Sequence, residues 1–362
     1  MHGPSGHTRF CKHRNQHHYY HTTHHMKERI AYIDALKVIA CFAVINLHCT
    51  SPWVSNFLGS PLWFVAMGNA VITHLAVPMF FMLAGAVIPE RIDDIGQHYR
   101  KTLWRYVAPT LLSLVLYKIL GILLLDQRDY LAGVFYNIGS NPGFHLWFMW
   151  IYIGYMVVLP VLVVIARDNT ARNVFIYSGI FFVFIVPFIA QWFSIIFPVK
   201  NIIFTVYGLY FVTGHHLAVS PSRFKSITLL KWFSIAYIAT YATATISSYD
   251  DTLYLAKFLT ADSIFIFALT SIAFLLIKQT CNHQCSILTT LSKHTFNIYL
   301  LHVAFFLKPF SFLAFPSITL HGLAGSIFVT TPITFILCLC ISVLLSIATR
   351  FVTKRARPGG LA

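Results

Sequence analysis

The chain has 362 residues, of which 57% are hydrophobic and only 10% are charged. A soluble globular domain carries about 25% charged residues, so this composition excludes an ordinary soluble protein and indicates a polytopic membrane protein. The formal net charge of +15 reflects membrane topology first. Because no surface interleaves basic with aromatic residues, we expect no nucleic-acid partner.

The first 25 residues are polar and rich in histidine. They cannot form a packed core, and they lack the apolar segment of a signal peptide. A tag, or an upstream extension with initiation at Met26, fits this tract better than a metal site. We therefore predict a tail over residues 1–25, a transmembrane domain over 26–353 and a basic cytoplasmic tail over 354–362.

From Tyr32 onward, apolar runs alternate with short polar breaks. A membrane-spanning helix needs about 17 to 25 predominantly apolar residues. The runs predict an all-α bundle of about ten transmembrane helices, near residues 32–51, 62–88, 106–125, 144–166, 174–197, 201–219, 227–247, 258–277, 291–315 and 323–349. The region 174–219 also admits a division that differs by a pair of spans, because proline can kink a membrane helix without ending it.

Basic residues test this division, because short cytoplasmic loops collect Lys and Arg. Most of the 26 basic residues fall in one alternating set of loops. The opposite set holds only Arg128, Lys200, Lys257 and Lys308. The asymmetry predicts that both termini are cytoplasmic and that the number of spans is even.

The first span is unusual because it contains Asp34, Lys37, Asn46 and His48. An ionisable side chain within the membrane costs about 2.5 to 3.5 kcal/mol on insertion scales, so such residues usually have a function. Lys37 and His48 are separated by three helical turns, which places them on one face about 16 Å apart. The alternative is that Asp34 and Lys37 anchor the helix at the membrane surface while His48 hydrogen-bonds a neighbouring helix.

Two later spans carry further polar side chains. His145 and Trp147 open the fourth span, at about the external depth of His48, so the two imidazoles could line one cavity. Trp147 also suits an interfacial aromatic belt. The ninth span begins SKHTFNIYLLH and includes Tyr299 and His302. Each of these residues could instead serve only as a hydrogen-bonding group between helices.

The segment after the second span, YRKTLWRYVAP, clusters Arg100, Lys101 and Arg105. Guanidinium groups match phosphate geometry, so this cluster is a candidate site for a phosphorylated cytosolic ligand. The alternative is simple anchoring to lipid headgroups. In the preceding span, we expect Pro78 to kink the helix and Gly85 to allow a close helix contact.

Motifs for several other functions are missing from the sequence. There is no GxSxG, HExxH, Walker A or dinucleotide-binding glycine pattern, so serine hydrolases, metalloproteases and nucleotide-driven motors lack their parts. The stretch CNHQC, residues 281–285, does not have a common zinc-binding spacing. We expect no bound metal or resident cofactor, and free thiols at the seven cysteines.

Four stretches, in this order, resemble the acyltransferase-3 family of integral membrane O-acyltransferases. They are YIDALKVIACFAVINLH, VPMFFMLAG, HLWFMWIYIGYMVVLP and SKHTFNIYLLH, within a resemblance that spans residues 32–350. The chain looks most like the branch that O-acetylates enterobacterial common antigen. The family pattern has an arginine, ten residues and then an essential histidine. His48 matches the histidine, whereas Lys37 stands at the arginine position and keeps the charge without the bidentate fork.

The resemblance implies an O-acetyltransferase of the cell inner membrane. Its acyl donor would be cytoplasmic acetyl-CoA, and its acceptor a hydroxyl of an envelope polysaccharide or of its polyprenyl-linked precursor. His48 and Lys37 would be catalytic, with His48 acting as a general base or as a transient acyl carrier. Arg100, Lys101 and Arg105 would bind CoA, although they match the family's basic motif only loosely. Asp34, His145, Trp147, Tyr299 and His302 would contact the acceptor.

Two other functions fit the same polar spans. A transporter or flippase for lipid-linked sugars could use Lys37, His48 and Lys118 along a substrate or proton path. The sequence shows no paired halves with matching broken helices, which many transporters have. A sensor or partner subunit without catalysis is the third possibility, and it would neither bind nor turn over CoA esters.

Overall fold

The computed structural model describes residues 30–56, 58–89, 91–125, 143–192, 205–250, 258–306 and 320–355. Within these ranges every regular element is a helix, which confirms the all-α prediction. The predicted tail over 1–25 and the end of the C-terminal tail lie outside the described residues. The six described cysteines are free thiols, as expected.

Helices occupy each of the ten predicted stretches. In chain order the α-helices are α1 (Ala31–Asn56), α2 (Pro61–Thr73), α3 (Ala76–Ala86), α4 (Ile95–Thr102), α5 (Ala108–Leu125), α6 (Trp147–Val157), α7 (Leu159–Arg167), α8 (Asn169–Gly179), α9 (Val186–Trp192), α10 (Val206–Val219), α11 (Ser226–Asp250), α13 (Ile264–Thr280), α14 (Ser286–Ser292), α15 (Thr295–Leu301), α16 (Leu320–Gly325) and α17 (Thr331–Arg355). Two 3-10 turns, η3 (Phe144–Leu146) and η5 (His302–Phe306), precede α6 and follow α15.

Among the described residues, five helical runs are long and apolar enough to cross a membrane. A sixth is added if the bent pair Phe144–Val157 and Leu159–Arg167 is one span. The five runs are Ala31–Ser55, Pro61–Ala86, Ile95–Leu123, Asn169–Ile189 and His321–Thr349. The chain is thus a multi-pass membrane protein, while the number of ten spans and the cytoplasmic side of both termini stay predictions.

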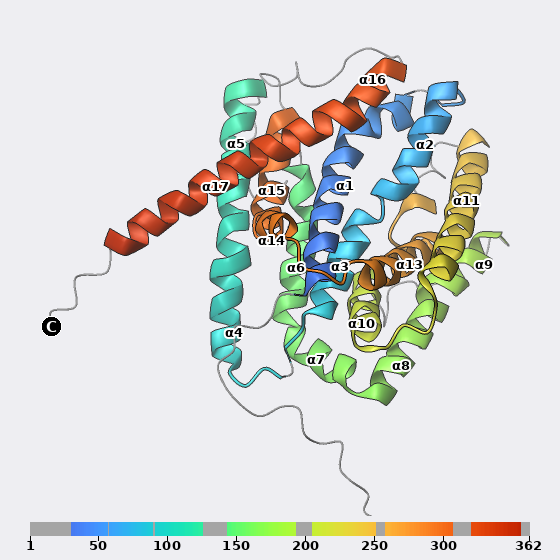
Figure 1. Ribbon diagram of the computed structural model, residues 1–362, viewed down its shortest axis with the longest axis horizontal. Coiled ribbons are helices and arrows are strands. Elements are labelled where there is room, and N and C mark those ends of the chain that lie inside the picture. Colours follow the sequence, from blue (N-terminus) through green and yellow to red (C-terminus); the bar gives the residue numbers. More distant parts are fainter. Residues whose placement is uncertain are drawn as a thin grey trace, which may run out of the picture.

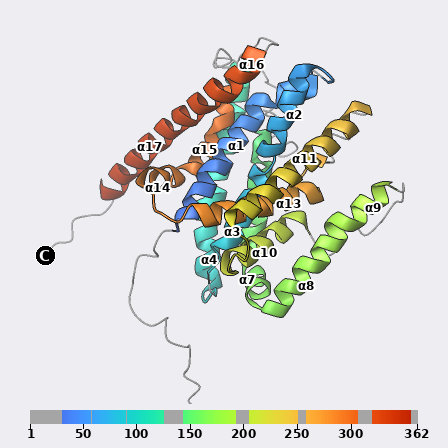
Figure 2. The same cartoon turned by 45° about the vertical axis from the view of Figure 1, so that its right-hand side comes forward.

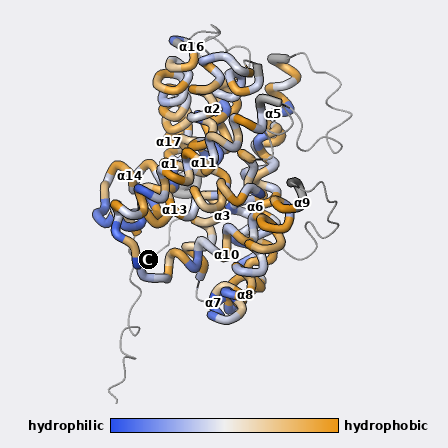
Figure 3. The backbone as a smooth tube through the Cα atoms, turned by 90° about the vertical axis from the view of Figure 1, so that its right-hand side faces the viewer, coloured by the Kyte–Doolittle hydropathy of each residue, from blue (hydrophilic) through white to orange (hydrophobic). Residues whose placement is uncertain are grey.

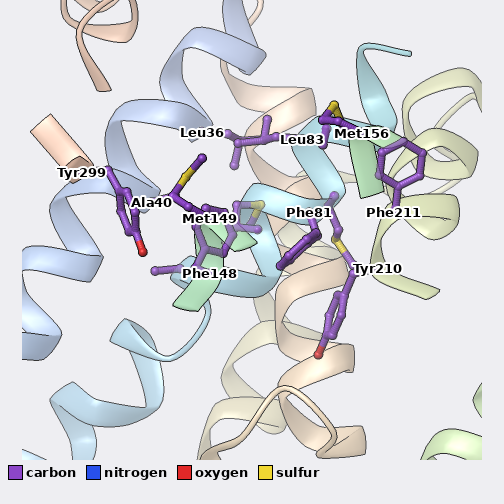
Figure 4. Close-up of a cluster of buried hydrophobic side chains, with 14 of the residues drawn as sticks. Leu36, Ala40, Phe81, Leu83, Phe148, Met149, Met156, Tyr210, Phe211 and Tyr299 are labelled. Carbon is purple, nitrogen blue, oxygen red and sulfur yellow. The ribbon is translucent and has the colours of Figure 1, made fainter. Parts of the chain in front are cut away.

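Helix α1 runs through the middle of the bundle (Figures 1 and 2). It packs against α2, α3, α13, α14, α15 and α17. Leu36 and Ala40 of this helix belong to one buried cluster with Phe81 of α3 and Phe148 of α6 (Figure 4). Since lipid tails are as apolar as this cluster, close packing rather than water exclusion holds such helices together. The first predicted span is therefore also the central helix of the fold.

Two glycines allow a very close contact between α3 and α10. A Cβ atom built on Gly85 would lie 1.8 Å from the main-chain oxygen of Phe211, and one on Gly214 would lie 2.1 Å from the oxygen of Met82. Only glycine permits this approach of two backbones. The close contact expected at Gly85 is confirmed, with Gly214 as its counterpart on α10.

Prolines explain most of the irregular helix geometry. Three π-helical turns, η1 (Leu103–Val107), η4 (Ile180–Ile185) and η7 (Ser326–Thr330), each end two residues before a proline, namely Pro109, Pro187 and Pro332. A proline has no N–H for the carbonyl four residues earlier and clashes with it, and a wider turn relieves that clash. The kink expected at Pro78 appears as the break at His74–Leu75, between α2 and α3.

The predicted fourth span is not a single straight helix. It bends by 68° between α6 and α7, at Val158. Pro160 cannot donate to the carbonyl of Met156, and the amide of Val161 bonds Val158 instead of Val157. The two released carbonyls accept hydrogen bonds from α4, one from Nε2 of His98 at 2.6 Å and one from the hydroxyl of Tyr99 at 3.2 Å. The bend thus provides the docking point for α4.

Many large hydrophobic side chains are exposed, as expected for a protein in lipid, and much of the backbone in Figure 3 has the colour of hydrophobic residues. The hydrophilic stretches gather around the α7–α8 turn and around α14. Helix α17 lies obliquely across α1, α5 and α15 in Figure 1 and is largely exposed along its apolar length.

Candidate active site

His48 projects from the second half of α1 and is half-buried. Its ring lies edge-on to Phe144 of η3 and tilted by 31° against His302 of η5, with ring centroids 5.3 Å away in both cases. Among the residues that the structure describes, neither ring nitrogen of His48 has a hydrogen-bond partner, and no carboxylate contacts the ring. Within the described part of the chain, the contacts of this imidazole are therefore ring contacts, with Phe144 and His302.

His145 and His302 complete a cluster of three imidazoles with His48. The rings of His145 and His302 are 5.1 Å apart and nearly perpendicular. Both side chains are buried, with His302 at 0% and His145 at 1% exposure. The sequence placed His48 and His145 at one depth, and the structure brings these two helices and the ninth predicted span together at that level.

Hydrogen bonds to main-chain carbonyls determine the tautomers of the two buried histidines. Nδ1 of His302 lies 2.6 Å from the oxygen of Tyr299, and Nε2 of His145 lies 3.4 Å from the oxygen of Leu300. A carbonyl oxygen can only accept, so each of these nitrogens carries the hydrogen. The remaining nitrogens, Nε2 of His302 and Nδ1 of His145, are then bare acceptors, and both are buried without a partner among the described residues.

Tyr117 of α5 shapes the turn that carries His302. Its hydroxyl donates to the oxygen of Leu300 at 2.9 Å and accepts from the amide of Ala304 at 3.1 Å. A regular α-helix would join this carbonyl directly to this amide. The inserted hydroxyl marks the change from α15 to the 3-10 turn η5. The ring of Tyr117 also packs edge-on against the ring of His145, with centroids 4.8 Å apart.

The predicted acceptor-binding residues differ in burial and in the residues that they contact. Tyr299 is buried and donates its hydroxyl to the main-chain oxygen of His145, so it positions the η3 turn. Trp147 is 40% exposed and contacts Phe148 and Tyr207 instead of the histidines. His145 and His302 belong to the cluster around His48.

Asp34 and Lys37 lie near the other end of α1. Asp34 is buried and accepts a hydrogen bond from the hydroxyl of Ser292 at 2.6 Å, while Lys37 is half-buried. Asp34 precedes His48 by about four helical turns, roughly 21 Å along the axis. It therefore does not belong to the same cluster as His48, and its observed role is to join α1 to α14.

The basic cluster occupies the exposed end of α4 and the π-helical turn η1. Arg100, Lys101 and Arg105 are all exposed. Lys101 donates to Gln97 at 2.7 Å, and the guanidinium of Arg105 lies 5.6 Å from the ring centre of Tyr106. Tyr106 in turn packs edge-on against Tyr152 and Phe296. Arg105 therefore lies against a group of packed aromatic rings, next to the exposed Arg100 and Lys101.

Two polar residues of the ninth predicted span have a structural role. Nδ1 of His294 lies 2.8 Å from the hydroxyl of Ser342, and the amide of Asn297 donates to the same oxygen at 2.9 Å. These contacts tie α15 to α17. They agree with the alternative that such residues serve as hydrogen-bonding groups between helices.

Tyr117, Phe144 and His74 are neighbours of the cluster that were not predicted from the sequence. His74 is close enough to His48 to interact with it electrostatically, and its Nδ1 lies 2.7 Å from the oxygen of Ala70. The signal for His74 and Tyr117 was present, since each is a polar residue within an apolar run. Across the described part of the chain, no set of His, Cys, Asp and Glu side chains is arranged to hold a metal ion.

Comparison with known proteins supports one family. The model of the acyltransferase-3 family, described as an acyltransferase domain, matches residues 30–351. The chain belongs to the acyltransferase-3 family. Neither a curated protein nor a solved structure matches it. This acyltransferase contains the whole three-histidine cluster, the basic turn and both ends of α1 within the matched residues.

Proposed function

We propose that this acyltransferase moves an acetyl group from cytoplasmic acetyl-CoA to a hydroxyl of an envelope polysaccharide, or of its polyprenyl-linked precursor, at the inner membrane. The observation that supports the proposal best is the imidazole of His48, which is oriented by Phe144 and His302 and has no hydrogen-bond partner among the described residues. A group of this kind can accept the proton of a sugar hydroxyl or attack a thioester.

The positions of the two candidate sites suit a CoA ester. Arg105 lies just before α5, and Tyr117, which contacts the histidine cluster, lies about 18 Å further along the same helix axis. CoA carries its phosphates and its thioester at opposite ends of a long pantetheine arm. Phosphates at the basic turn would therefore leave the thioester free to extend toward His48.

His48 would perform the central chemical step. As a general base, it takes the proton of the acceptor hydroxyl while the hydroxyl oxygen attacks the acetyl carbonyl carbon, and the proton then passes to the CoA thiolate as the C–S bond breaks. As an acyl carrier, it would itself form and lose a bond to the acetyl group. Both routes need an unoccupied ring nitrogen. Lys37, on the same face of α1, would supply positive charge toward the donor side.

Under this proposal the remaining predicted residues divide by position. Arg100, Lys101 and Arg105 bind donor phosphates. His145 and His302 contribute to the acceptor end, with Tyr299 holding the main chain of His145, and Trp147 contacts the acceptor from the surface. Asp34 acts at the opposite end of α1 through its bond to Ser292. Membrane lipids surround the bundle.

The test is an assay with the purified protein in nanodiscs and isotope-labelled acetyl-CoA. Envelope glycans from deletion and complemented strains serve as acceptors and are analysed by mass spectrometry. The expected result is labelled product with a gain of about 42 Da per acetyl group, which the His48→Ala variant does not form. If no labelled glycan forms, and the same protein in sealed proteoliposomes moves an unmodified lipid-linked glycan across the membrane, the proposal is contradicted and transport is favoured.

A further inference from the structure

We propose that His302 is the hydrogen-bond acceptor for protonated His48, occupying the place that a carboxylate has beside the catalytic histidine of many acyl-transfer enzymes. This inference rests on the proposed function, because it assigns a role in the step that His48 performs. It makes His302 a positioning residue for the base instead of a contact to the acceptor sugar.

The need for such a partner follows from the surroundings of His48. When an imidazole takes a proton from a hydroxyl, the cation that forms requires an acceptor for its second N–H, and an acidic side chain usually provides it. Among the residues that the structure describes, no carboxylate contacts His48. The polar atoms offered to it within the cluster are imidazole nitrogens.

His302 has the correct nitrogen available. Its Nδ1 is committed to the oxygen of Tyr299, so Nε2 carries a lone pair and no hydrogen. This nitrogen is completely buried and has no partner among the described residues. A buried acceptor without a donor is costly, so a cationic donor from His48 would be well matched to it.

The ring separation leaves room for the bond. Two imidazoles joined edge to edge by an N–H···N hydrogen bond have ring centres about 5 Å apart, close to the 5.3 Å between His48 and His302. Since Nε2 of His302 has no partner among the described residues, forming the bond requires the ring of His48 to turn a nitrogen toward it. His145 also has a bare nitrogen, but its ring is nearly perpendicular to that of His302 and has no direct ring contact with His48. Catalytic hydrogen bonds commonly tighten only when substrate is bound.

The chemical step remains balanced. The acceptor oxygen bonds to the acetyl carbonyl carbon, its proton moves to His48, and the C–S bond of the thioester breaks. His302 holds the opposite N–H of the imidazolium throughout and exchanges no net proton. The proton on His48 then neutralises the leaving thiolate.

Two substitutions separate this role from simple packing. His302→Asn keeps a donor near the position of Nδ1 and removes the acceptor at Nε2, whereas His302→Gln places an amide oxygen near the position of Nε2. We expect His302→Asn to lower kcat about 10-fold or more with little change in either KM, and His302→Gln to recover a large part of it. His294→Asn, which keeps a polar group near the position of Nδ1 toward Ser342, is the matched control and should retain activity.

A second measurement does not depend on activity. In protein labelled with 15N-histidine, His302 should show a hydrogen on Nδ1 and none on Nε2. Acidification should then produce a 15N–15N coupling between Nε2 of His302 and His48 across the shared proton. An Nε2–H tautomer, or no coupling once His48 is protonated, would overturn the inference. Full activity in His302→Asn, with activity lost in His48→Ala, would overturn it while leaving the proposed function intact. Absence of acetyl transfer by the wild type would remove the proposed function, and the coupling would still decide the His48–His302 bond.

Discussion

The rings of His48 and His302 lie 5.3 Å apart although they come from the first helix and from the turn after α15. This contact exists because α15 packs directly on α1. It also depends on the hydroxyl of Tyr117, which bonds both the oxygen of Leu300 and the amide of Ala304 where η5 begins. With Phe144 of η3 on another side, His48 of α1 therefore depends on η3, on α15 with η5, and on α5 for its orientation.

Replacing His48 with alanine should abolish most acyl transfer and leave the fold intact. Loss of a general base typically costs about 10² to 10⁴-fold in rate, while the ring nitrogens of His48 form no hydrogen bond within the described residues that folding would lose. Acetyl transfer and thermal unfolding in detergent should be measured together. His283→Ala, in an exposed loop, is the control. A near wild-type rate in well-folded His48→Ala protein would refute the catalytic assignment.

Neutralising the basic turn should weaken binding of the donor. If Arg100, Lys101 and Arg105 hold CoA phosphates, their triple replacement by Gln should raise the KM for acetyl-CoA about 10-fold or more, with kcat less affected. The matched control replaces the exposed Arg223, Lys225 and Lys231 by Gln, which removes the same charge elsewhere. Equal donor KM values in the two triple variants would show that the turn serves only as a membrane anchor.

Two substitutions of Lys37 should have different effects on activity. Lys37→Arg keeps the positive charge and should retain activity, whereas Lys37→Ala should lower kcat/KM about tenfold, equivalent to about 1.4 kcal/mol of transition-state stabilisation. Steady-state kinetics at saturating acceptor would measure both variants. Equal activity in Lys37→Ala and wild type would mean that this lysine only anchors α1.

The contact between α3 and α10 should not tolerate a methyl group. In Gly85→Ala, the new Cβ would overlap the main-chain oxygen of Phe211, so the two helices must separate. We expect a loss of about 1 to 3 kcal/mol or more in stability, seen as a lower unfolding temperature in detergent. Gly154→Ala is the control, because its Cβ would meet no atom within 4 Å. An unchanged unfolding temperature in Gly85→Ala would contradict the packing.

Helix α11 offers a test of topology. It has 25 residues, about 37 Å at 1.5 Å per residue, which is enough to cross the hydrocarbon core. Cysteines introduced at Arg223 and Asp250 should therefore react with impermeant reagents from opposite sides, with position 223 cytoplasmic. Labelling of both positions from one side would exclude the ten-span arrangement.

Much of the fold was predictable because apolar run length and proline position act locally. The ten apolar stretches all contain helices, and the effects of Pro78 and Gly85 follow from the geometry of those residues alone. The 68° bend at Val158 was missed, since a proline in an apolar run does not reveal whether a side chain such as His98 will satisfy the released carbonyls.

The candidate site was predictable in part. His48, His145 and His302 attract attention because imidazoles are rare within apolar spans, and counting residues gives His48 and His145 a common depth. Tyr299 and Trp147 could not be assigned from the sequence, because the direction of each side chain depends on neighbouring helices. The hydroxyl of Tyr299 donates a hydrogen bond to the main-chain oxygen of His145, and the ring of Trp147 packs against Tyr207.

The bend at Pro160 has an evolutionary consequence. The carbonyl of Met156, which this proline leaves without an amide partner, is the one that His98 binds. The position of α4, and of the basic turn that follows it, therefore depends on Pro160. A residue with an N–H at position 160 would let α6 continue straight, because its amide would bond the carbonyl of Met156. That carbonyl would then no longer accept the hydrogen bond from His98. Among homologous chains, Pro160 and His98 should thus be gained and lost as a pair. A homologue that has one without the other should hold its basic turn in a different position.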